Sequence, residues 1–225
     1  MRNSKHVANE LWDITVDEDE ILNSHYVLSL FTHTPVNKAE RLQRLQKDTA
    51  WKRTTELEID DIIELLEFLL TATYLIFRGH IYCQRFGTAM RSPVFPMVVD
   101  IHMELLEQMT IVTVPLEYKP RLWKRYVDDI LEVINKETVE ALTEHLNQVD
   151  TTGSIKFTHE TEVDKMIPLL DTLIVRKGDL RVKLLVYRKK THTEQEPDFS
   201  SHHPLQHKLN VVRTLLDRCS QIVTG

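Results

Sequence analysis

The sequence predicts an α+β fold in which helices cover one face of an antiparallel sheet. Short runs of β-branched and aromatic residues occur in pairs separated by turn residues, a pattern typical of antiparallel hairpins. They are mixed with longer segments whose apolar residues recur at the helical period, without the regular alternation of a parallel βαβ array. A chain of 225 residues with 42% hydrophobic residues suits one globular domain, or one domain with a small appendage.

The predicted strands are the runs rich in β-branched and aromatic residues. In chain order they cover residues 21–31, 74–77, 81–86, 122–127, 130–134, 155–161, 169–175 and 180–187. Arg78-Gly79 and Gly178-Asp179 supply the turns of two hairpins. The adjacent acids Asp128 and Asp129 separate two further strands, so they are expected at a hairpin tip.

The predicted helices follow from apolar spacing and from prolines that suit a first helical turn. They cover residues 38–47, 59–74, 92–108 and 137–149, with one or two short helices in 203–223. Pro35 precedes the first of them, and Ser92-Pro93 opens the third.

Composition and charge narrow the class of protein. Cys83 and Cys219 are far apart, which favours a reducing, intracellular compartment without a disulfide framework. The start of the chain is too polar for a signal peptide, and four acids interrupt the most apolar window, 59–77, so no membrane span is expected. The net charge is −6, but residues 176–225 hold 10 Lys and Arg against 5 Asp and Glu. A basic C-terminal segment of this kind fits a protein that contacts phosphate groups there. Ordinary surface charge that is unevenly distributed explains it about as well.

Asp128 and Asp129 are the strongest candidates for chemistry. Paired carboxylates at a hairpin tip can hold Mg²⁺, a hard cation that prefers oxygen ligands. Two such ions, roughly 3.5–4 Å apart, can activate a hydroxyl and stabilise a leaving pyrophosphate. A solvated turn is the alternative. The flanking pairs Tyr126-Val127 and Ile130-Leu131 favour a binding role. If these apolar neighbours are buried, they hold the two acids at an exposed tip, an arrangement that suggests a bound ligand.

Several motifs, in order, resemble those of reverse transcriptases. Arg125-Tyr126-Val127-Asp128-Asp129 resembles motif C, and residues 86–93 (FGTAMRSP) resemble motif B of Penelope-like retroelements and their relatives. Residues 29–36 resemble the end of their motif A. Residues 167–172 and 187–193 resemble segments that follow the palm motifs, and residues 201–208 and 212–218 resemble the helix-turn-helix-like segment beyond them. The resemblance covers nearly the whole chain.

This resemblance implies a reverse-transcriptase palm, with RNA-directed DNA polymerase (nucleotidyltransferase) as the ancestral activity. It implies Mg²⁺ as cofactor, an RNA or DNA template-primer as partner, and no small-molecule partner beyond nucleotides. Asp128 and Asp129 match the metal carboxylates. Phe31 matches the steric gate against the sugar, Gly87 a close approach to template or nucleotide, and Tyr126 a position beside the primer end.

Three departures predict that this chain is inactive. The motif A aspartate, five residues before the gate aromatic, is Tyr26, which is neutral at pH 7 and bulky. His25 cannot substitute, because the two-residue period of a strand points it to the opposite face. Arg91 replaces a glycine beside the nucleotide, and Phe95 replaces a small polar residue. The expectation is therefore a truncated, degenerate palm.

Two segments are predicted: a palm fragment over 1–186, with the fingers largely missing, and a helix-turn-helix-like or thumb-start segment over 187–225. In the second segment Arg188, Lys189 and Lys190 are candidates for nucleic-acid binding. Two alternatives remain open. One is a non-catalytic nucleic-acid-binding module, and the other is a decayed open reading frame without function.

Overall fold

The computed structural model describes residues 9–11, 14–34, 45–46, 50–84, 87, 94–150, 153–189 and 198–222. Its contacts divide the chain into two units. The first unit comprises Met1–Tyr26, Pro120–Val139 and His159–Gly225, and the second comprises Val27–Lys119 and Glu140–Thr158.

The main sheet has four strands in the spatial order β4-β5-β1-β6. These are β1 (Glu20–Leu28), β4 (Leu122–Tyr126), β5 (Asp129–Asn135) and β6 (Lys156–Thr161). Strand β5 pairs antiparallel with both β4 and β1, so β1 inserts between the β4–β5 hairpin and β6. This arrangement brings residues about a hundred positions apart in the sequence into one row.

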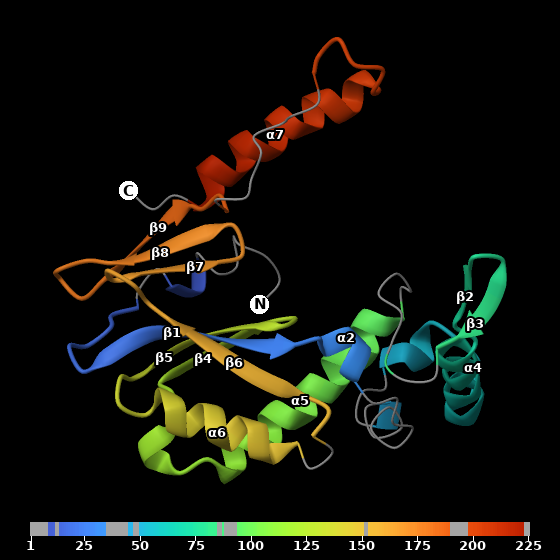
Figure 1. Ribbon diagram of the computed structural model, residues 1–225, viewed down its shortest axis with the longest axis horizontal. Coiled ribbons are helices and arrows are strands. Elements are labelled where there is room, and N and C mark those ends of the chain that lie inside the picture. Colours follow the sequence, from blue (N-terminus) through green and yellow to red (C-terminus); the bar gives the residue numbers. More distant parts are fainter. Residues whose placement is uncertain are drawn as a thin grey trace. The chain divides into compact units, whose positions relative to one another are not determined.

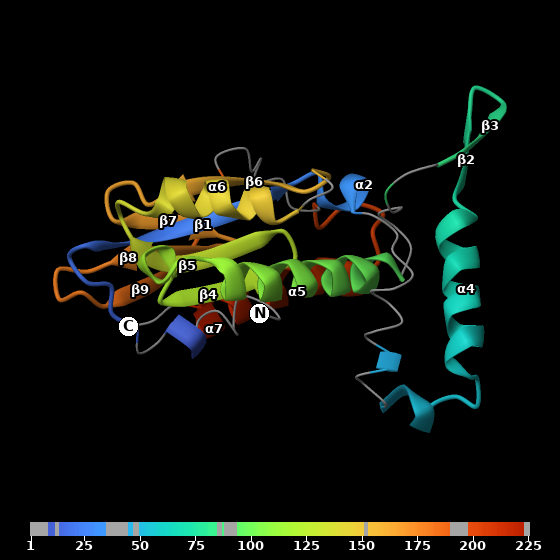
Figure 2. The same cartoon turned by 90° about the horizontal axis from the view of Figure 1, so that it is seen from below.

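A second antiparallel sheet packs on one face of the main sheet. It is formed by β7 (Met166–Leu169), β8 (Thr172–Arg176) and β9 (Val182–Val186), in that order. Buried residues of the two sheets form one apolar core, which includes Leu22 and Leu131 from the main sheet and Ile167, Ile174 and Leu184 from the second. Figures 1 and 2 show β7–β9 stacked against β1, β5 and β4. Removing these side chains from water is the main stabilising term of this unit.

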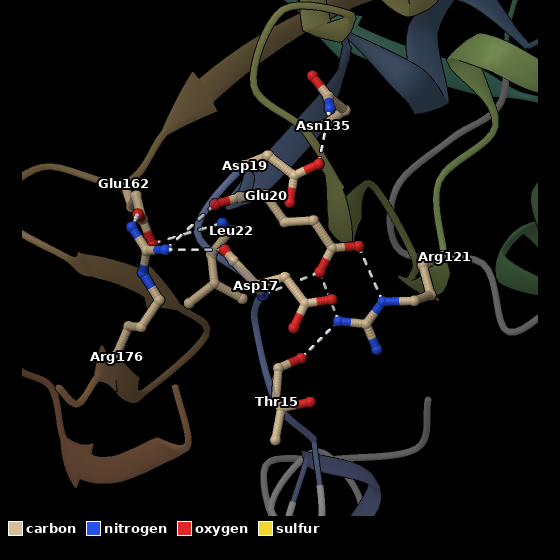
Figure 3. A network of polar contacts seen from close by, with 9 residues as sticks. All are labelled: Thr15, Asp17, Asp19, Glu20, Leu22, Arg121, Asn135, Glu162 and Arg176. Atoms are coloured by element: carbon tan, nitrogen blue, oxygen red, sulfur yellow. Dashed lines mark hydrogen bonds and ion pairs between the residues drawn. The ribbon is translucent and has the colours of Figure 1, made fainter. Parts of the chain in front are cut away.

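Two arginines fasten the beginning of β1 (Figure 3). Arg176 donates to the backbone oxygens of Asp17 (3.3 Å) and Glu20 (3.1 Å) and pairs with the buried carboxylate of Glu162. Arg121 pairs with the Glu20 carboxylate at 2.6 Å and donates to the Thr15 carbonyl at 2.5 Å. Together they hold the end of β1 that lies away from Tyr26.

The second unit holds most of the helices and one hairpin. In chain order its elements are α2 (Leu30–His33), the 3₁₀ turn Ala50–Arg53, α4 (Ile59–Thr71), β2 (Tyr74–Phe77), β3 (His80–Cys83), α5 (Phe95–Thr113), the 3₁₀ turn Leu116–Tyr118 and most of α6 (Val139–Val149). A capping box between Glu58 and Asp61 opens α4. Helices α5 and α6 are joined by a 3.0 Å hydrogen bond between Thr113 Oγ1 and His145 Nε2.

The chain ends on α7 (Leu205–Ile222), which packs against β9 in the first unit. Lys208 Nζ donates to the carbonyls of Phe199 and Ser201, at 2.5 Å each, and thereby ties the preceding turn to the helix. Among the described helices, none combines the length and the apolar character that crossing a bilayer requires.

The structure confirms the predicted α+β class, the antiparallel hairpins and the Arg78-Gly79 and Gly178-Asp179 turns. Two details of the sequence prediction were wrong. The first strand ends at Leu28, and helix α2 follows. The run 169–175 is interrupted at Leu170, where a positive φ of 55° turns the chain back between β7 and β8. Where one or two short helices were expected over 203–223, residues 205–222 form one helix, and the described range 198–222 holds no helix-turn-helix. The helix expected over 38–47 lies mostly outside the described residues.

Candidate active site

The predicted carboxylates lie at the turn between β4 and β5. Tyr126 and Asp129 are the last paired residues of the hairpin, so Val127 and Asp128 form a two-residue turn. Val127 has a φ of 55°, a conformation that a β-branched residue rarely adopts. Such strain persists only where the surrounding structure imposes it, and it concentrates at functional sites.

Tyr26 lies directly opposite Asp129. The register of β1 and β5 pairs Tyr26 with Asp129, and the register of β4 and β5 pairs Tyr126 with the same residue. Paired residues of antiparallel strands point to the same face, so Asp129 has a tyrosine on each side. The position predicted for the third carboxylate is therefore next to Asp129, and a phenol occupies it.

Burial decides the protonation states of Asp129 and Tyr26. Burial, and then the neighbouring charge of Asp128, raises the pKa of Asp129 to about 6, while the charge of Lys189 lowers it. Burial, followed by the charges of Asp129, Glu160 and Asp128, raises the pKa of Tyr26 above its ordinary value of 10.0. Tyr26 is therefore a neutral phenol at pH 7 and supplies no anionic ligand.

His25 points to the opposite face of the sheet, as predicted. Its Nδ1 lies 2.6 Å from Glu132 Oε1, and both side chains are completely buried. Asn23 Nδ2 donates to the other Glu132 oxygen at 3.3 Å, and the His159 ring meets the His25 ring edge-on at 5.8 Å between centroids. His25 thus belongs to a buried polar cluster behind the sheet. Sequence reasoning missed Glu132 in this cluster, although a single acid inside the apolar run 130–134 was a signal.

The segment after β9 carries residues that influence the pKa values of Asp129 and Tyr26. Tyr187 donates its backbone N–H to the Asp171 carbonyl at 2.8 Å, which fixes the start of this segment. The charge of Lys189 acts on Asp129, and Tyr187 is among the groups that raise the pKa of Tyr26. Arg188 and Lys189 are exposed, whereas Lys190 lies outside the described residues. Nothing in the sequence alone placed Lys189 near Asp129.

Phe31 and Gly87 belong to the second unit. Phe31 is half-buried in α2. Gly87 has a φ of 72°, and a Cβ at this position would lie 2.2 Å from the carbonyl oxygen of Thr32. Gly87 thus lies close against the backbone of α2. Arg91 lies outside the described residues.

Comparison with known proteins identifies the type of fold that the chain adopts. No family model matches the chain, and no curated protein matches it. The solved structures that match it include two of telomerase. Apo telomerase from Candida tropicalis, truncated from its C-terminal domain, aligns with a TM-score of 0.57 and 13% identity over 81% of this chain and 40% of its own. Telomerase from Candida albicans, in complex with a TWJ fragment of telomeric RNA, aligns with a TM-score of 0.61 and 10% identity over 81% and 35%.

The chain has a reverse-transcriptase palm-like fold. Telomerase is a reverse-transcriptase-related enzyme, and this chain spans well under half of either structure. The donor set that the described residues supply at this hairpin does not fit a two-metal site. Among the described residues, no group of three His, Cys, Asp or Glu side chains could hold a metal ion. Asp128 and Asp129 offer two carboxylates, and the adjacent position in β1 offers a neutral phenol.

Proposed function

We propose that this chain is a reverse-transcriptase-like palm of Penelope-like descent that does not polymerise nucleotides as it stands. The observation that carries the proposal is the pairing of Tyr26 with Asp129. Two-metal nucleotidyl transfer needs carboxylates that hold both ions while charge develops on the attacking and leaving oxygens. A neutral, half-buried phenol beside Asp129 provides no such charge, and it occupies volume where a shorter carboxylate would leave room.

Primer extension tests this proposal. The unchanged chain is given an RNA template, a DNA primer, deoxynucleotides and Mg²⁺, and is compared with Tyr26→Asp, Arg91→Gly and the double variant. We expect no extension by the unchanged chain. Extension by the double variant that disappears when Asp129→Asn is added would identify Tyr26 and Arg91 as the blocks. Metal-dependent extension by the unchanged chain overturns the proposal.

A second candidate is a non-catalytic nucleic-acid-binding module. It is supported by the exposed Arg188 and Lys189 after β9 and by the influence of the Lys189 charge on Asp129. Each phosphate contact makes binding more sensitive to salt. We expect salt-dependent binding to an RNA–DNA hybrid that falls when Arg188, Lys189 and Lys190 become Ala. Lys136→Ala, an exposed lysine just past the far end of β5, is the matched control. Equal loss in both variants contradicts this candidate.

A further inference from the structure

Helix α4 presents an acidic and apolar surface. Leu65, Phe68 and Leu69 are exposed by 52%, 65% and 47%. Exposed acids precede two of them by one helical turn, Asp61 before Leu65 and Glu64 before Phe68. The whole helix has four acidic residues and no basic one. We call Asp61, Glu64, Leu65, Phe68 and Leu69 the α4 surface.

Helix α7 presents an apolar stripe of the opposite charge. Leu205, Leu209, Val212 and Leu216 are exposed by 57%, 42%, 55% and 65%. Successive members are four, three and four residues apart, the alternating spacing that keeps one seam of a helix facing another helix. Exposed Arg213 lies one turn from both Leu209 and Leu216. The helix has three basic residues and one acidic residue.

This stripe is distinct from the side of α7 that faces the second sheet. The less exposed apolar residues of α7 are Val211 and Leu215, on a neighbouring row, and α7 packs against β9. The α7 stripe, defined as Leu205, Leu209, Val212, Arg213 and Leu216, therefore remains available to a partner. A contiguous exposed apolar row of this kind marks an interaction site.

We propose that the chain self-associates, with the α7 stripe of one copy packing on the α4 surface of a second copy. Charge selects this pairing over the two symmetric ones. Contact of α4 with α4 sets acids against acids. An antiparallel contact of α7 with α7 that aligns Leu209 with Val212 sets Arg213 against Lys208 of the second copy. Contact of α4 with α7 instead brings opposite charges and apolar rows together.

The test is sedimentation equilibrium of the full chain over about 1–100 µM. We expect concentration-dependent association of the unchanged chain. Phe68→Gln and Leu209→Gln should each raise the dissociation constant about tenfold, by removing buried apolar contact. Glu64→Arg and Arg213→Glu should each raise it roughly fivefold, and the double exchange should return it to within about twofold of the unchanged chain.

Ile76→Gln is the matched control, since Ile76 in β2 is 75% exposed but lies outside both surfaces. It should leave association unchanged, and circular dichroism melting verifies that each variant folds. Three results overturn the proposal. One is a chain that stays monomeric at every concentration. A contact between α7 and α4 of the same copy would also give this result. Another is an association that Ile76→Gln abolishes and Phe68→Gln does not. The third is a double exchange without recovery.

Discussion

Tyr26 of β1 and Asp129 of β5 face each other in the register of the main sheet, and Tyr126 of β4 faces Asp129 from the other side. The hairpin thus has palm-like backbone pairing, while the paired position in β1 offers a phenol and no carboxylate. Sheet register depends on backbone pairing and on which face is buried, so it survives a substitution that removes a ligand.

Tyr26→Asp should create a cation-binding site. The substitution places a third carboxylate beside Asp129, so Mg²⁺ should stabilise the folded variant. At a free Mg²⁺ concentration about 100 times the dissociation constant, the free energy of unfolding rises by roughly 2.7 kcal/mol. Urea unfolding with and without Mg²⁺ measures this gain. Tyr26→Asn is the control without charge, and an equal gain in the unchanged chain would contradict the reasoning.

Asp129→Asn should stabilise the protein at neutral pH and not in acid. The folded pKa of Asp129 is raised to about 6, whereas the unfolded value is near the ordinary 3.8. The folded state therefore holds its proton more tightly, and stability is lost as the pH rises from about 4 to 6. Because Asp129 is only half-buried, the gain at pH 7 should be on the order of 1 kcal/mol. Urea titrations from pH 4 to 8 measure the difference between the two proteins. A difference that does not vary with pH would argue against a raised pKa.

The sequence predicts the features of the site that depend on the local pattern within one strand. It does not predict the contacts between segments that are far apart in the sequence. Alternation within β1 predicts that His25 and Tyr26 point to opposite faces, and they do. Glu132 is different, because its burial depends on His25, 107 residues away. The action of Lys189 on Asp129 likewise needs the second sheet in place. The turn at Leu170 was missed because a leucine with positive φ leaves no trace in an apolar run.

Arg176→Met should destabilise the first unit strongly, whereas Arg121→Met should not. The Arg176 and Glu162 side chains are exposed by only 13% and 5%, so losing the arginine leaves a buried carboxylate uncompensated. We expect a loss of about 3 kcal/mol, which Arg176→Met with Glu162→Gln should partly restore. The Arg121 side chain is 46% exposed, and its loss should amount to about 1 kcal/mol or less. Chemical denaturation of the four proteins measures this contrast, and equal losses in the two single variants would contradict it.

Gly87→Ala should destabilise the second unit through a backbone clash. An added Cβ would lie 2.2 Å from the Thr32 carbonyl oxygen, and the φ of 72° is unfavourable for alanine. The combined loss should be about 2–4 kcal/mol. Gly153→Ala is the control, since Gly153 has a φ of 64° with no described atom within 4 Å of an added Cβ, and its loss should be about 1 kcal/mol. Thermal unfolding compares the two, and similar losses would show that Gly87 serves only its φ.

Val127→Gly should stabilise the β4–β5 hairpin. Val127 is the first central residue of a two-residue turn and has a φ of 55°, whereas glycine reaches positive φ without steric penalty. Its side chain is 38% exposed, so little apolar burial is lost. Relief of strain of about 1–3 kcal/mol should outweigh the roughly 0.5–1 kcal/mol that glycine loses in backbone entropy. Denaturant unfolding should therefore show a gain of about 1 kcal/mol, with a smaller gain for Val127→Ala, which keeps a Cβ but loses the branch. A loss of stability in Val127→Gly would mean that the valine side chain contributes more by packing than it loses by its backbone conformation.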